Sequence, residues 1–315
     1  MKKIIILLIV FLTVVELSAQ QDPHYTHYMF NTLTVNPAYA GSRDALTVTG
    51  LYRNQWVGFK GAPFTQTLSV HSPVLNNKLG LGLTLVNDRI GPTNNTSVFA
   101  DFAYRIPLGK SKKAKLALGI KGGLDIKQFR LSEVALRNES DPEFTTYNNK
   151  LLPNVGFGIY YSTDNFYLGA AVPKILENYY DKNRDGKETA DNSRQRRHYN
   201  FIMGAVFKLS KSLKLKPTML VKVLESAPPT LDLTASLLIK DVVWTGLAFR
   251  TASKSIDAVS LLLGVNITKQ FAVGYSFDYS ITNESFKHNW GSHELMLRYD
   301  FIFKKRIKIK SPRYF

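Results

Sequence analysis

The sequence lacks cysteine, and after its first residues it lacks any long hydrophobic run. The absence of cysteine excludes disulfide scaffolds, thiolate metal sites and cysteine nucleophiles. Beyond residue 19 no apolar stretch approaches the ~18 residues that a transmembrane helix needs, which excludes helical membrane spanning. Prolines number only 13, whereas 12% of the 315 residues are aromatic, and this composition argues against disorder or a collagen-like fold.

The first 19 residues have the pattern of a cleaved secretory signal peptide. Lys2 and Lys3 precede the apolar run 4–15, and the small residues at 17–19 form a cleavage site, so we expect the mature chain to start at Gln20. A membrane-anchoring helix is the alternative, but the run is too short to cross a bilayer. The net charge of +17 would suit nucleic acid, yet export removes the chain from that partner, so we expect no nucleic acid.

Hydrophobic residues alternate with small or polar ones through most of the chain. In 79–85 every odd position is leucine, and segments 116–126 and 271–281 repeat the alternation, as strands with one apolar face do. Weaker alternation marks further segments at 45–53, 64–71, 96–106, 154–162, 166–172, 198–209, 213–223, 231–239, 242–250, 258–267 and 293–303. The sequence therefore predicts fourteen strands.

The connections between these strands fall into two classes. Connections after even-numbered strands are mostly tight, at 163–165, 210–212, 240–241 and 268–270, and those after odd-numbered strands include the long polar segments 127–151, 173–197 and 282–292. This alternation is typical of an outer-membrane barrel with both termini in the periplasm and its long loops outside. We therefore predict an all-β, antiparallel transmembrane barrel over residues 44–303.

A secreted β-sandwich or propeller would also alternate, but it would not need aromatic residues where the apolar band ends. Near the strand ends, seven tyrosines occupy the same alternate positions as the apolar residues and so face the same side of the sheet: Tyr52, Tyr104, Tyr161, Tyr199, Tyr275, Tyr279 and Tyr299. An interfacial aromatic girdle requires this placement, which favours a barrel in contact with outer-membrane lipid.

Residues 20–43 form a separate N-terminal segment. Tyr25, Tyr28, Met29 and Leu33 lie near one face of a short helix, which must end by about Val35 because a residue before proline avoids the α region. We expect this helical or extended segment either to plug the periplasmic mouth of the barrel or to lie as a strap against its wall.

Several motifs together resemble a known family. They are Asn36-Pro37-Ala38-Tyr39-Ala40-Gly41, Arg53-Asn54-Gln55-Trp56, Leu79-Gly80-Leu81-Gly82, Asp88-Arg89-Ile90-Gly91 and the terminal 311–315. This set resembles the PorP/SprF family of type IX secretion system outer-membrane proteins of Bacteroidetes. The resemblance implies a non-enzymatic component that helps export large adhesins, gliding or hydrolytic cargo, or hold them at the surface. The 36–38 motif is also similar to the hatch of fatty-acid transport barrels, so a barrel for small or hydrophobic solutes is the alternative.

Charged residues occur at inward-facing positions of the expected wall. Asp101 and Arg105 share one strand and Lys121 and Asp125 the next, while the set Arg53, Asp278, Arg298 and Asp300 lies across the closure seam. Opposite signs suggest mutual neutralisation that narrows the lumen. An ordinary hydrated lumen wall explains them equally well.

Other motifs carry weaker chemical signals. Segment 181–192 begins like a calcium loop, but Asn192 cannot supply the bidentate carboxylate, so a polar surface loop is the better interpretation. The six histidines show no zinc spacing, and His71 has lumen parity without a serine motif nearby. We expect no enzyme activity, no metal and no cofactor.

Basic residues concentrate on the expected periplasmic side. They surround two turns, at 110–115 and 208–216, and fill the tail 304–315 with Lys304, Lys305, Arg306, Lys308, Lys310 and Arg313. Such clustering predicts an electrostatic dock, for which the family resemblance implies a periplasmic ring component of the secretion machine. Acidic lipid headgroups, or recognition of Phe315 by an assembly factor, are alternatives.

Overall fold

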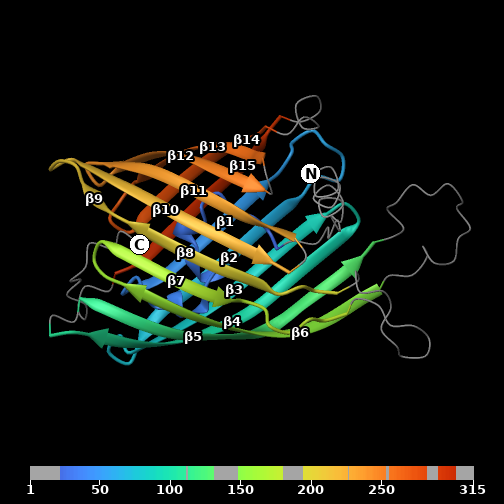
Figure 1. Ribbon diagram of the computed structural model, residues 1–315, viewed down its shortest axis with the longest axis horizontal. Helices are drawn as coiled ribbons and strands as arrows, with labels where there is room; N and C mark the ends of the chain where they lie inside the picture. The colour runs from blue at the N-terminus through green and yellow to red at the C-terminus, as the bar shows by residue number, and fades with distance from the viewer. Residues whose placement is uncertain are drawn as a thin grey trace, which may run out of the picture.

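The protein is a closed antiparallel β-barrel (Figure 1). The computed structural model describes residues 22–110, 113–130, 148–179, 194–225, 227–252, 255–281 and 290–302. Its strands are β1 Leu46–Asn54, β2 Phe64–Val74, β3 Leu79–Ile90, β4 Thr93–Leu108, β5 Ala114–Phe129, β6 Asn148–Ser162, β7 Phe166–Val172, β8 His198–Ala205, β9 Phe207–Lys208, β10 Leu213–Leu224, β11 Ala227–Ile239, β12 Val243–Ala252, β13 Ser255–Asn266, β14 Phe271–Ser280 and β15 Ser292–Phe301. Each strand pairs with its neighbour along the chain, and β1 pairs with β15 to close the barrel.

The wall has the fourteen strands that the alternation predicts. The single strand expected at 198–209 is divided into β8 and β9, both of which pair with β10. The break falls at Val206, whose N–H donates to Asn165 in the preceding turn instead of continuing the ladder. β8 and β9 therefore occupy one place in the barrel.

The barrel has two distinct ends. We call the end where β1, β3, β5 and β7 finish the loop end, and the opposite one the turn end. The expected loop 127–151 is shorter than predicted, because β5 continues to Phe129 and β6 begins at Asn148. The added residues include the polar Lys127, Gln128, Asn149 and Lys150, and they pair in register because strands that extend beyond the apolar band reach water.

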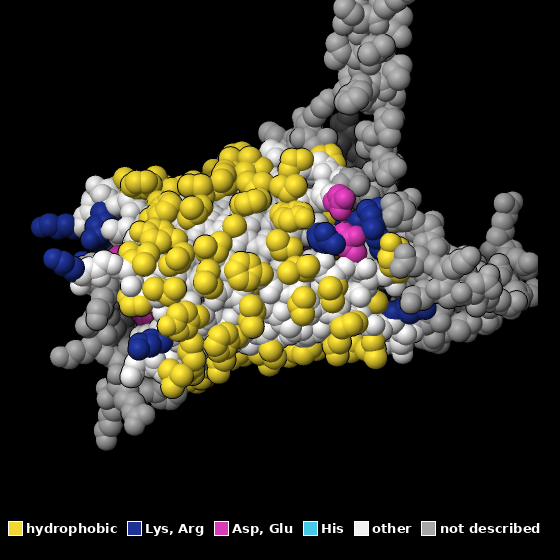
Figure 2. Space-filling view, turned by 60° about the horizontal axis from the view of Figure 1, so that its bottom comes forward, with side chains coloured by type: hydrophobic (Ala, Val, Ile, Leu, Met, Phe, Trp, Pro, Cys, Tyr) yellow, Lys and Arg dark blue, Asp and Glu magenta, His cyan; other side chains and the backbone are white. Residues whose placement is uncertain are grey.

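The outer face of the wall is an apolar band (Figure 2). Alternate residues along each strand are exposed and hydrophobic, among them Leu83, Ile120, Phe157 and Leu261, while the residues between them face inward. Six of the seven girdle tyrosines are exposed large hydrophobics, and Tyr161 is partly exposed. Among the described residues no helix is long and apolar enough to cross a membrane.

Residues 22–43, which we call the plug segment, run inside the barrel from the loop end to the turn end. Three 3₁₀ turns shape them: η1 Tyr28–Phe30, η2 Thr32–Thr34 and η3 Pro37–Tyr39. The expected single helix up to Val35 is wrong, because Asn31 adopts φ −129° and ψ 54° and interrupts it. The placement at the periplasmic mouth is also wrong, since the segment fills the lumen along its length and Asp22 lies at the loop end beside Lys174.

Candidate functional site

The candidate site is the contact between the plug segment and the inner wall. The plug segment is buried almost throughout, and Tyr28, Leu33, Asn36 and Ala38 have at most 1% of their surface exposed. In a porin this space would hold water. Here the side chains and backbone of the plug segment occupy it.

The motif from Asn36 to Gly41 is the turn that fixes the plug segment to the wall. The Asn36 side chain accepts a 2.9 Å bond from the Ala38 N–H and so caps η3, while Pro37 supplies the φ of its first residue. The same side chain donates to Ile159 O at 2.9 Å and to Ala170 O at 3.3 Å. Asn36 therefore shapes the turn and binds two wall strands at once.

Inward-facing glycines let this turn touch the wall. A Cβ added to Gly80 would lie 2.0 Å from Ala40 O, and one added to Gly119 would lie 2.2 Å from Ala38 N. At Gly158 the obstacle would be Asn36 Oδ1, at 2.1 Å. Only glycine allows backbone to approach a strand so closely, so the leucine–glycine alternation of β3 reflects plug docking as well as strand periodicity.

The end of the motif is held by two wall side chains. Gly41, with φ +72°, donates its N–H to His71 Nδ1 at 3.2 Å, and its carbonyl accepts a bond from Arg105. Tyr39 packs edge-on against both His71 and Tyr160. His71 is therefore a buried structural contact between the wall and the plug segment.

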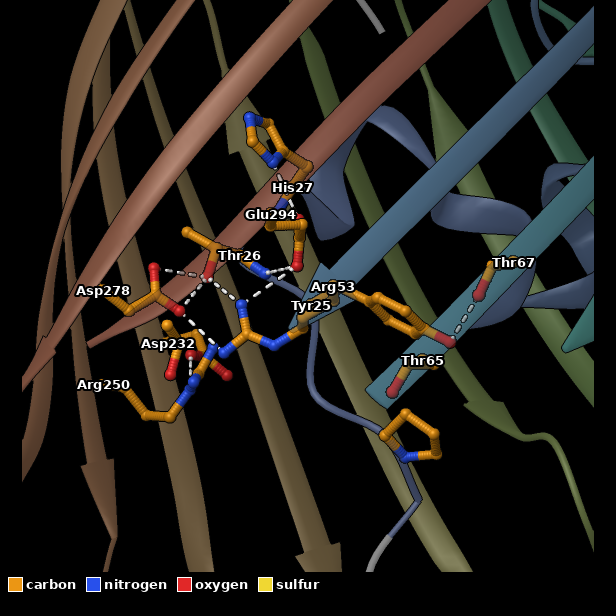
Figure 3. A network of polar contacts seen from close by, with 12 residues as sticks. Tyr25, Thr26, His27, Arg53, Thr65, Thr67, Asp232, Arg250, Asp278 and Glu294 are labelled. Atoms are coloured by element: carbon orange, nitrogen blue, oxygen red, sulfur yellow. Dashed lines mark hydrogen bonds and ion pairs between the residues drawn. The ribbon is translucent and has the colours of Figure 1, made fainter. Parts of the chain in front are cut away.

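A charged network holds the plug segment near the loop end (Figure 3). Arg53 on β1 pairs with Asp278 at 2.7 Å and with Glu294 at 3.1 Å, and it donates to Thr26 Oγ1. Glu294 also accepts from the N–H groups of Thr26 and His27, while Thr26 Oγ1 donates to Asp278. Side chains of β1, β14 and β15 thus bind two consecutive plug residues, Thr26 and His27, at the closure seam, where β1 pairs with β15.

A matching contact lies near the turn end. Arg43 pairs with Asp300 at 2.9 Å, and Thr47 donates to the same carboxylate at 2.7 Å. Because Thr26 and His27 are bonded to the seam strands at the loop end, the plug segment is tied to these strands near both ends.

The seam charges expected as one set form two. Asp278 is paired in register with Ser292, whereas Arg298 is opposite Ala272, six residues further along β14 and ~20 Å away. Arg53 and Asp278 therefore belong to the loop-end network. Arg298 lies 4.0 Å from Asp300 in the turn-end contact.

The other inward charges are also paired. Asp101 lies 3.4 Å from Lys121, whose ammonium also donates to Leu33 O in the plug segment. Arg105 pairs with Asp44 at 3.1 Å. Asp125 pairs with Lys174 at 3.0 Å, and Lys174 reaches Asp22 at 3.1 Å. Every charge in the expected set thus has an opposite partner.

Asp22 and Lys174 lie outside the spanning strands. Burial alone would raise the pKa of Asp22, but Lys174, followed by His198, holds it well below its usual range. The Lys174 pKa is raised because the two neighbouring carboxylates outweigh its burial. The first described residue of the plug segment is thus held by an ion pair at neutral pH.

Several site residues were missed at the sequence level. Glu294, Asp232 and Arg250 lie at inward-facing positions of their strands, so the alternation could have identified them. Arg250 pairs with Asp232 at 2.6 Å beside the Arg53 network (Figure 3). Thr26 and His27 carried no signal, because they contact strands more than 200 residues away.

The remaining features singled out in the sequence are Trp56, the possible metal ligands and three segments at or beyond the barrel ends. Trp56, a residue of the family motif, lies at the loop end with 41% of its surface exposed, and its backbone N–H donates to Ser292 Oγ. Within the described ranges no group of histidine and carboxylate side chains could hold a metal ion. The 181–192 loop, the signal peptide and the basic tail lie outside the described residues.

Comparison with known proteins identifies the family. Three solved structures are similar to the chain at low identity: the outer membrane protein Omp33 of Acinetobacter baumannii (9% identity, 82% of this chain and 99% of that one, TM-score 0.48), a TodX mutant monoaromatic hydrocarbon channel (10%, 87% and 94%, 0.49) and the CymD monoaromatic hydrocarbon channel (9%, 89% and 94%, 0.49). No curated protein sequence matches the chain. The model of the type IX secretion system membrane protein PorP/SprF family matches residues 17–299, nearly the whole length, and the chain belongs to this family.

Proposed function

We propose that this barrel is a sealed, non-enzymatic outer-membrane component of type IX secretion that helps export a large cargo, such as an adhesin, or hold it at the surface. The observation that carries the proposal is the plug segment, which occupies most of the lumen and is bonded to the wall near both ends. A barrel closed in this way is suited to holding partners on its rims.

The character of the contacts supports a closed resting state. Arg53, Asp278 and Glu294 are each at most 1% exposed. Removing one member of a buried ion pair leaves an uncompensated charge and costs roughly 3–5 kcal/mol. Withdrawal of the plug segment would remove the bonds that Thr26 and His27 make to these buried carboxylates and would also break the Arg43–Asp300 pair, so the closed lumen should dominate.

Planar-bilayer conductance and recovery of partners test the proposal together. The purified barrel should give no steady conductance, and a large surface protein should co-purify with it from its own outer membrane. A steady open channel with solute selectivity, and no such protein, would instead support transport of small or hydrophobic solutes.

The basic tail is the proposed dock for a periplasmic ring component. Replacing Lys304, Lys305, Arg306, Lys308 and Lys310 by Gln, while keeping 311–315, preserves any terminal assembly signal. Barrel assembly should persist, cargo display should fall, and recovery of the periplasmic partner should become more salt-sensitive. Unchanged display together with unchanged recovery would refute this dock.

A further inference from the structure

A cavity of about 250 Å³ remains in the lumen at the turn end, beside the plug segment. Its lining includes Phe30, Lys216, Leu238, Asp241, Trp244 and Arg298. Asp241, which lies in the turn between β11 and β12, has a side chain 59% exposed, so the cavity opens towards the turn end. It shares only Arg298 with the plug contacts described above.

Two cations lie on the same aromatic ring in this cavity. The Lys216 ammonium and the Arg298 guanidinium are each 5.4 Å from the centroid of the Phe30 ring. The one acidic residue among these lining residues, Asp241, pairs with Lys214 at 2.5 Å, and Asp300, which lies 4.0 Å from Arg298, is outside the lining. The lining therefore presents positive charge beside an aromatic surface, an arrangement that favours an anion with an apolar body.

Trp244 forms the apolar side of the cavity. Its ring lies 4.6 Å from Phe30 and edge-on to His27, and only 3% of the residue is exposed. Its Nε1–H is buried and has no acceptor within the part of the chain that the structure describes. This edge of the indole packs over Gly264 on β13, so Trp244 contributes apolar surface to the cavity.

We propose that this cavity binds a small amphiphilic carboxylate that enters from the turn end. The carboxylate lies between Lys216 and Arg298, and the hydrocarbon or aromatic body packs on Phe30, Leu238 and Trp244. A carboxylate matches the planar fork of arginine, and the volume lies just below the usual range for ligand sites, which limits the ligand to a short chain. This inference is independent of the proposed secretion role.

Titration calorimetry of the full-length barrel in a neutral maltoside detergent tests the site, with octanoate as the probe. Octanoate should bind saturably, and octanol should bind at least about tenfold more weakly because it lacks the charge that the two cations recognise. Lys216→Gln or Arg298→Gln should reduce octanoate affinity by about tenfold and leave octanol unchanged. Octyl phosphate should bind no tighter than octanoate.

The matched control is Lys211→Gln, an exposed lysine in a turn at the same end, which should bind octanoate like the parent. If Arg298→Gln fails to fold, as judged by heat-modifiable gel mobility, the octanoate and octanol comparison and Lys216→Gln decide the outcome. Equal affinity for octanoate and octanol, no saturable binding, tighter binding of octyl phosphate, or an equal loss in Lys211→Gln would each overturn the proposal.

Discussion

Adding one methyl group at Gly119 should loosen the plug segment without disturbing the outer wall. The new Cβ would lie 2.2 Å from Ala38 N, 2.4 Å from Ala38 Cα and 2.6 Å from Pro37 C. All three are backbone atoms of a turn that Asn36 holds to two other strands, so the turn cannot yield by a side-chain rotation. Restoring van der Waals contact requires the turn to retreat by more than 1 Å, and overpacking of this kind costs ~1–3 kcal/mol.

Amide hydrogen exchange over 36–41 measures this cost directly. Because about 1.4 kcal/mol corresponds to a factor of ten, protection in this segment should fall roughly 5- to 150-fold in Gly119→Ala. Single-channel recording should show brief openings that the parent lacks, since the displaced turn no longer seals the lumen.

Gly122→Ala is the matched control, three residues away on β5. Gly122 faces outward, and an added Cβ there meets nothing within 4 Å. This variant should keep the exchange protection of the parent. Unchanged protection in Gly119→Ala, or an equal loss in Gly122→Ala, would refute the reasoning that backbone proximity seals the barrel.

Three further predictions concern the wall, the orientation and the ion pair at the loop end. Leu83→Arg places a charge on the lipid face and should destabilise the folded barrel by ~2–4 kcal/mol in urea titrations in lipid vesicles, whereas Leu83→Phe should be mild. A cysteine at Asn148 should react with an impermeant maleimide on whole cells; labelling only after lysis would reverse the orientation. Because the pKa of Asp22 is depressed, its contribution to stability is complete above the unfolded value of about 4 and is lost only as pH falls through the folded value. Exchange protection at residues 23–25 should therefore be unchanged between pH 7 and 5, and Asp22→Asn should reduce it at both.

The strands of the wall could be predicted from the sequence because the alternation of side chains along a strand depends only on neighbouring residues. Alternation from Leu79 to Leu85 assigns each side chain to lipid or lumen without knowledge of any other strand. The same parity placed Asp101, Arg105, Lys121 and Asp125 inside, where the structure has them paired.

The path of the plug segment could not be predicted, because its contacts are long-range. Thr26 bonds to Asp278, which is 252 residues away, and the identity of one residue does not indicate that the other is its partner. Gly80 and Gly119 occupy inward-facing positions of their strands, where the alternation allows any small or polar residue. The pattern alone therefore cannot reveal that the backbone of a turn lies against these two glycines. The division of the seam charges into two sets likewise depends on strand register, which was not available from parity.

The course of the plug segment constrains the order of assembly. A chain that enters at one end of a closed cylinder and leaves at the other cannot be inserted sideways once the cylinder is complete. η3 packs against β4, β5 and β6, which are complete by residue 162, whereas the carboxylates that pair with Arg53 and Arg43 lie on β14 and β15. The early strands can therefore assemble on this segment as a template while the sheet is still an open, curved surface. The last strands close over it, so that pairing of β1 with β15 and capture of the lumen segment are one and the same folding event.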